Sequence, residues 1–295
     1  MRPARRDSSM SIDAKTVGEL RKRTGLPMMK CKKALQEAGG DLEVAADNLR
    51  KQGVKASEKV AARELKEGLV FVHREGNGAC AVSLMCQTDF VAKSEDVVAF
   101  GKQLAQELYT RAPSDTGTGD QLDDFEINGT TVKKTYDDFA LKMGENIKVG
   151  EWARFVPETG AVAIYEHHNG RIAAVVEFEG KGLGDAEAVM ELGKHLGMQL
   201  SFHKDVKALT RDELDAEWVA KEREIFIAQA ENMPEDKRAM IAEGKLNKRL
   251  KDVVLLEMPF IMNDKVSVQD QVAAIAKDAG VEMSLKRFAR IGAGA

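Results

Sequence analysis

The chain has 295 residues, of which 31% are charged, and its formal net charge of −4 gives no basic surplus of the kind that nucleic-acid binding usually needs. Three cysteines form no disulfide-like framework, and no apolar run reaches the roughly 18 residues of a membrane span. We therefore expect a cytoplasmic protein of two or three modules that binds neither nucleic acid directly nor a membrane.

The amino-terminal part divides into three stretches. Residues 1–12 are predicted to be a disordered leader, because three arginines stand there without a hydrophobic segment. Residues 13–53 predict three short helices, with Asp41 capping the third and Gly53 ending it. Residues 54–67 are highly charged and predict a solvated helical linker. A three-helix unit of this size resembles the ubiquitin-associated (UBA) type and suits a docking role.

The rest of the chain repeats a pattern of strands followed by a helix, which predicts an α+β fold. Residues 68–149 and 150–295 are expected to form two related α+β core subdomains with antiparallel sheets, divided near Gly150. Inside the second, heptad-like spacing over about 211–253 predicts a protruding antiparallel helical hairpin, restarted at Pro234. A helix over 268–279 and a strand over 281–290 complete that subdomain.

A strand-to-helix corner lies near residue 90, in Cys86-Gln87-Thr88-Asp89-Phe90-Val91-Ala92-Lys93. An acid beside a large aromatic residue at such a corner can point outward from a rigid scaffold. Thr88 and Asp89 are also ordinary helix-start residues, and Phe90 could staple the first turn into the core. From the residues alone, the ordinary helix start is the simpler interpretation.

The string 86–93 resembles the signature of the elongation factor Ts family, the bacterial guanine-nucleotide exchange factors of elongation factor Tu. A second string, Leu20-Arg21-Lys22-Arg23-Thr24-Gly25 followed by Met28-Met29-Lys30-Cys31-Lys32-Lys33-Ala34-Leu35, resembles the family's amino-terminal motif. The resemblance covers about 12–291. It implies binding to elongation factor Tu in its GDP-bound and nucleotide-free forms, disturbance of its magnesium and phosphate site, and release of GDP so that GTP can bind.

The resemblance also implies which residues touch the partner. At the corner, Phe90 would be an apolar wedge and Asp89 a group that rearranges hydrogen bonds near the magnesium ion. Met143 replaces the isoleucine that is usual in the family's Ile-Gly-Glu-Asn string. The implied positions are Thr88, Asp89, Phe90 and Val91 at the corner, Arg21, Met28 and Met29 in the three-helix module, Met143 and Gly144 before the second subdomain, and His167 in a second contact area.

Other kinds of site fit the sequence poorly. The run 180–184 is rich in glycine, but the third glycine of a dinucleotide fingerprint would fall on Asp185 or Glu187, and no P-loop motif occurs. Neither the cysteines nor the histidines have metal-ligand spacing, and no nucleophile elbow occurs. We expect no cofactor, no metal and no chemical turnover. The alternative is an adaptor that uses the three-helix module and the hairpin without exchange activity. An outward Phe90 would favour exchange, and an inward Phe90 the adaptor.

Overall fold

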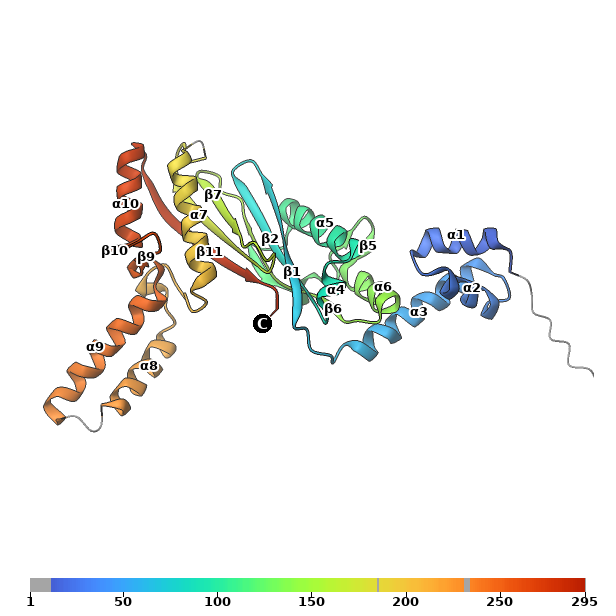
Figure 1. Cartoon of the computed structure of the whole chain (residues 1–295), viewed down its shortest axis with the longest axis horizontal. Coiled ribbons are helices and arrows are strands. Elements are labelled where there is room, and N and C mark those ends of the chain that lie inside the picture. Colours follow the sequence, from blue (N-terminus) through green and yellow to red (C-terminus); the bar gives the residue numbers. More distant parts are fainter. Residues whose placement is uncertain (1–11, 185, 231–233, 295) are drawn as a thin grey trace, which may run out of the picture.

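A computed structural model describes residues 12–184, 186–230 and 234–294. The predicted leader, apart from Ile12, and the hairpin turn at 231–233 lie outside these residues. The molecule is elongated, with the amino-terminal helices at one end, a projecting helical hairpin at the other and the two larger sheets between them (Figure 1). The α+β class with antiparallel sheets is confirmed. Within the described residues, no helix has the length and apolar character needed to cross a membrane.

The amino-terminal module consists of α1 (Ala14–Thr24), α2 (Met28–Glu37) and α3 (Leu42–Val60). As predicted, Asp41 caps α3, since its carboxylate accepts hydrogen bonds from the Glu43 and Val44 amides at 2.9 and 3.0 Å. The predicted stop at Gly53 is wrong. α3 passes through it, and a Cβ there would lie 3.3 Å from the Asp137 carbonyl oxygen of α6 (Val132–Met143). Gly53 thus allows two helices to approach closely, and only the part of the predicted linker up to Val60 is helical.

The first sheet has the order β1 (Glu67–Glu75), β2 (Gly78–Cys86), β6 (Ile147–Phe155) and β3 (Thr116–Thr118), all antiparallel. One face packs on α5 (Glu95–Arg111) and α6, with Cys80, Val82 and Leu84 turned toward the helices. The short elements η1 (Gly119–Leu122), β4 (Glu126–Ile127) and β5 (Thr130–Thr131) join α5 to α6. The predicted boundary near Gly150 needs correction, because β6 runs through it and pairs with β2 on both sides.

The second sheet has the order β11 (Met283–Gly292), β8 (Ile172–Gly180) and β7 (Ala161–Glu166). Its outer face is covered by α7 (Glu187–Phe202) and α10 (Val268–Ala279). Its inner face packs on the first sheet through small and β-branched residues, among them Ala79, Ala81, Ala173 and Val175. The core therefore has four layers, helix, sheet, sheet and helix, as Figure 1 shows.

The projecting hairpin consists of α8 (Ala216–Gln229) and α9 (Glu235–Val253). Ion pairs join its helices, Arg223 to Glu243 at 3.3 Å and Arg249 to Glu222 at 3.7 Å. α8 begins after Asp215 rather than near residue 211, where the hairpin was predicted to begin, and Arg211–Glu213 form the 3₁₀ turn η2 instead. The chain returns to the core through η3 (Leu255–Glu257), β9 (Pro259–Phe260) and β10 (Asn263–Ser267), two strands that the sequence did not predict.

Candidate partner-binding corner

The corner is a one-turn helix, α4 (Asp89–Ala92), set between β2 and α5. Thr88 caps it, because its side-chain oxygen accepts a hydrogen bond from the Val91 amide at 3.4 Å. The Ser94 hydroxyl donates to the Val91 carbonyl at 2.7 Å and closes the turn. Ala92 is buried at its inner side. The sequence thus folds into a sharp turn whose direction is set by hydrogen bonds at both ends.

Phe90 points away from the protein, and 84% of its surface is exposed. Its neighbour Val91 packs against the core of the first subdomain, so successive residues of the turn face opposite sides. Asp89 is half-exposed and pairs with Lys93 at 3.1 Å, one helical turn away. The structure therefore excludes the interpretation of Phe90 as a staple and leaves an aromatic ring next to a carboxylate on the surface.

The segment after α6 holds the corner from the side. The Thr88 hydroxyl donates to Glu145 Oε1 at 2.8 Å, and the Thr88 amide donates to Glu145 Oε2 at 3.2 Å. The Asn146 amide donates to the side-chain oxygen of Gln87 at 3.0 Å. Burial, and to a smaller extent the Glu145 carboxylate, raises the pKa of the Cys86 thiol to about 12, so this thiol stays neutral at pH 7.

Met143 and Gly144 are brought next to the corner by this segment. Gly144 ends α6 in the left-handed region at φ 75°, a conformation that glycine adopts without strain. Met143 is half-buried against the first core, whereas Gly144 is exposed. The two residues thus lie beside the hydrogen bonds between Glu145 and Thr88.

His167 lies in the turn between β7 and β8, half-buried, with its Nδ1 3.1 Å from the Tyr165 hydroxyl. In the same turn the Gly170 carbonyl accepts a hydrogen bond from the Val70 amide at 2.8 Å, and Arg171 pairs with Glu67. Glu67 is the β1 residue opposite Cys86, the last residue of β2. His167 and the corner therefore lie at the same end of the sheets.

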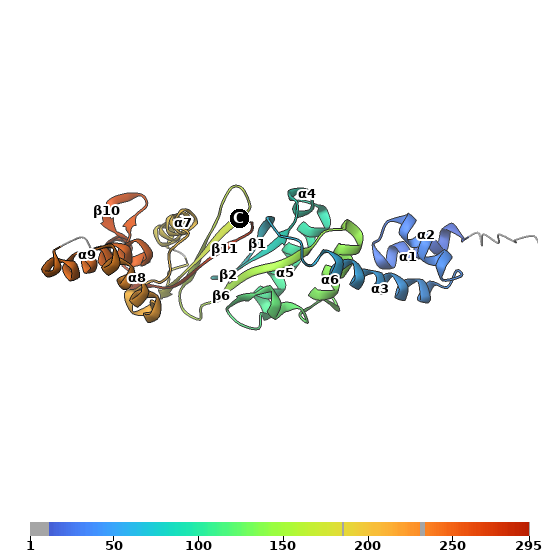
Figure 2. The same cartoon turned by 90° about the horizontal axis from the view of Figure 1, so that it is seen from below.

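Arg21, Met28 and Met29 are not part of this cluster. They lie in the three-helix module, which stands beyond α6 and apart from α4 in both views (Figure 1 and Figure 2). All three are exposed, Met28 to 52% and Met29 to 72%. The Lys30 ammonium donates to the Leu141 carbonyl of α6, which ties the module to the first subdomain. The structure therefore presents two separate surfaces, one at the corner and one on the module.

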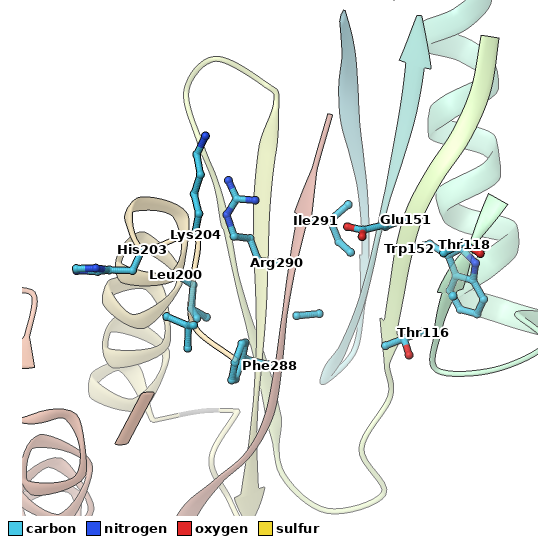
Figure 3. Close-up of a pocket in the computed structure, with 13 residues that line it drawn as sticks. Thr116, Thr118, Glu151, Trp152, Leu200, His203, Lys204, Phe288, Arg290 and Ile291 are labelled. Carbon is cyan, nitrogen blue, oxygen red and sulfur yellow. The ribbon is translucent and has the colours of Figure 1, made fainter. Parts of the chain in front are cut away.

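A cavity of about 520 Å³ lies elsewhere, between β3, β6, β11 and the end of α7. Figure 3 shows Lys204 and Arg290 on one side of it and Glu151 on the other. The thiol of Cys80 and the hydroxyl of Tyr136, whose pKa values are raised mainly by burial, lie instead in the core between the first sheet and its helices. In the part of the chain that the structure describes, no group of three or more His, Cys, Asp or Glu residues could hold a metal ion.

A model of the family described as elongation factor TS matches residues 87–295, a span that begins at the corner. The chain belongs to the elongation factor Ts family. It is 38% identical over 290 residues to an elongation factor Ts of Clostridioides difficile, a match that covers 96% of this chain and 93% of that protein. The elongation factor Ts of Syntrophotalea carbinolica is 37% identical over 95% of this chain and 92% of its own length. The resemblance seen in the two motifs is confirmed.

The sequence did not identify the residues that hold the corner in place. Gln87, Glu145 and Asn146 lie next to assigned positions, but their partners are distant in the chain, with Thr88 and Glu145 separated by 57 residues. The only available signal was that the Met-Gly-Glu-Asn string contains two polar residues after the helix stop. That pattern indicates side chains available for bonding and does not reveal their partners.

Proposed function

We propose that this protein is a guanine-nucleotide exchange factor of elongation factor Tu. It binds the GDP form, places the corner against the magnesium and phosphate site, and so promotes GDP release. The observation that carries the proposal is the exposure of Phe90, at 84%, on a corner held by hydrogen bonds. An aromatic ring this exposed contributes little to the protein's own core, but it becomes a strong anchor when a partner buries it.

The exchange needs no chemical step by this chain, only thermodynamic coupling. A protein that binds the nucleotide-free partner more tightly than the GDP-bound one weakens GDP binding by the same factor, because linkage is reciprocal. In this proposal Phe90 is the wedge, and Asp89 competes for hydrogen bonds near the magnesium ion. Loss of that ion removes the positive charge that offsets the diphosphate, so GDP leaves and GTP can replace it.

The remaining assigned residues supply grip in this proposal. Met28 and Met29 are flexible, exposed apolar side chains suited to an adaptable contact, and the exposed Arg21 lies on α1 of the same module. Met143, Gly144 and His167 lie at the same end as the corner and extend its contact. The adaptor alternative predicted an inward Phe90, so the outward direction of Phe90 makes it less favoured.

The test is release of a fluorescent GDP analogue from elongation factor Tu, with the unmodified protein and with Phe90→Ala and Asp89→Ala. Truncating a fully buried aromatic anchor costs roughly 2–4 kcal/mol, so Phe90→Ala should lower the rate at low factor concentration by roughly 30- to 1000-fold. Met240→Ala is the matched control, since Met240 is 69% exposed but lies on α9, in the hairpin. It should leave release unchanged.

Because the side chains of Phe90 and Met240 are exposed, neither Phe90→Ala nor Met240→Ala should alter the temperature of thermal unfolding, which is measured first. Failure of the unmodified protein to accelerate GDP release would refute the exchange function. Equal loss in Phe90→Ala and Met240→Ala would refute the role of the corner.

A further inference from the structure

The segment 144–146 connects three parts of the chain that are distant in sequence. It follows α6, it bonds to the corner at 87–88, and it bonds to the residues that follow α3 at 61–63. The corner and the long helix of the three-helix module therefore share one support. These are the two regions that the proposed function uses.

Glu145 fixes the corner through both carboxylate oxygens. One oxygen accepts a hydrogen bond from the Thr88 hydroxyl, and the other accepts one from the Thr88 amide. The Thr88 hydroxyl oxygen in turn accepts a hydrogen bond from the Val91 amide. A helix of one turn has little stability of its own, because helix nucleation is unfavourable. The direction in which Phe90 points therefore depends on these outside contacts.

Asn146 joins the corner to the end of α3. Its side chain is almost fully buried, at 5% exposure, and its Nδ2 donates to the carbonyls of Ala61 at 3.2 Å and Arg63 at 3.4 Å. The Arg63 guanidinium donates in return to the Gly144 carbonyl at 3.1 Å. Two short segments thus bond to one another in both directions, and α3 leaves this junction toward the module.

We infer that Glu145 and Asn146 are positioning residues for exchange: Glu145 holds Phe90 in its outward direction, and Asn146 fixes the corner relative to the three-helix module. The inference rests on the proposed function. It differs from a purely structural role in one respect. If Glu145 acts through Phe90, then Phe90→Ala should slow GDP release little further once Glu145 has been replaced. A purely structural residue would instead lower the amount of folded protein, and Phe90→Ala would still slow GDP release by the same factor.

The experiment is a double-mutant cycle on GDP release from elongation factor Tu, with Phe90→Ala, Glu145→Ala and the double variant. Hydrogen bonds to a charged group are strong, so Glu145→Ala should slow release roughly 10- to 100-fold. The double variant should be slower than Phe90→Ala by less than about threefold, because the two residues act together. Glu145→Gln keeps one acceptor for the Thr88 amide and gains an NH₂ group that can donate to the Thr88 hydroxyl oxygen, so it should retain most of the activity that Glu145→Ala loses.

Amide hydrogen exchange of α4 supplies a readout that needs no partner. Glu145→Ala should make the Val91 and Ala92 amides exchange faster, with exchange in β2 unchanged. If Glu145→Ala does not fold, Thr88→Val breaks the same contact from the other side and takes its place in the cycle. For Asn146 the corresponding cycle pairs Asn146→Ala with Met29→Ala, and the effect of Met29→Ala should shrink in the Asn146→Ala background.

The outcomes separate the two proposals. If the unmodified protein accelerates release and Phe90→Ala slows it, but the effects of Phe90→Ala and Glu145→Ala multiply independently, the exchange function stands and the positioning role of Glu145 is overturned. Independent effects of Asn146→Ala and Met29→Ala overturn the role of Asn146 in the same way. If the unmodified protein does not accelerate release, both proposals fail together.

Discussion

A buried carboxylate holds the arginine that links the two halves of the core. Glu177 on β8 is wholly buried, and it contacts Arg287 Nε at 2.6 Å and Lys286 Nζ at 3.1 Å, both on β11. The Arg287 guanidinium continues to Asp115 at 2.6 Å and lies over the Phe155 ring, so it reaches the first subdomain. Glu177→Gln should therefore destabilise the contact between the two sheets.

The expected loss of stability depends on how far the partners of Glu177 are exposed to water. Removing one partner of a fully buried ion pair costs about 3–5 kcal/mol. Here the side chains of Lys286 and Arg287 are 43% and 32% exposed, and Asp115 still accepts from Arg287 after the change. We therefore expect a loss of about 2 kcal/mol for Glu177→Gln. Asp115→Asn should cost less than about 1 kcal/mol, because the Asp115 side chain is 49% exposed and its charge is screened by water.

Urea unfolding measures both values. Glu177→Gln should lower the midpoint without changing the slope of the free energy with urea, since the substitution alters stability and not the surface exposed on unfolding. A loss for Glu177→Gln no larger than that for Asp115→Asn would refute the reasoning. It would show that the buried charge does not hold the two sheets together.

Two further predictions concern other buried or paired groups. A hydrogen bond from Arg211 lowers the pKa of Glu257 at the base of the hairpin, so its stabilising effect is present above the unfolded pKa of about 4.3 and is lost as pH falls through the lower folded pKa. Glu257→Gln should therefore flatten the loss of thermal stability in acid below about pH 4.3, and unchanged curves would contradict this. Tyr136→Phe leaves the buried Val149 amide, now 3.0 Å from the hydroxyl, without its acceptor and should cost about 1–3 kcal/mol in urea unfolding. Equal midpoints would contradict that estimate.

Local signals in the sequence predicted local features. The cap at Asp41 and the span of α10 each depend on residues close together in the sequence, and both agree with the structure. β2 shows little alternation between apolar and polar residues, because it is buried on both faces. Ala79 and Ala81 pack against the second sheet, and Cys80 and Val82 pack against α5 and α6. A strand of this kind reads as a continuous apolar run, which gives its span but not which side faces which layer.

Tertiary contacts account for the errors. Gly53 has the composition of a helix stop, but its missing side chain serves the close approach of α3 to α6. Gly150 marks an irregularity in the pairing of β2 with β6, where the Ser83 hydroxyl bonds to Glu151, and not a boundary between subdomains. In both cases glycine allows a close contact with a distant segment, and one sequence does not show that segment. The direction of the Phe90 side chain could not be predicted for the same reason, because it depends on contacts with a segment that is distant in the sequence.

The rigidity of the corner decides whether an exposed ring can act as a wedge. Ordering the backbone of four free residues, 88–91, on binding would cost on the order of 4–8 kcal/mol. This exceeds the roughly 2–4 kcal/mol expected from burying the ring in a partner. In this protein the Thr88, Val91 and Ser94 hydrogen bonds are already formed before any partner binds. The ordering cost is therefore met during folding, so in the proposed exchange the whole gain from burying Phe90 would act on the partner's nucleotide site. In the proposed mechanism the contribution of Phe90 to exchange depends on Glu145, a residue that need not touch the partner at all.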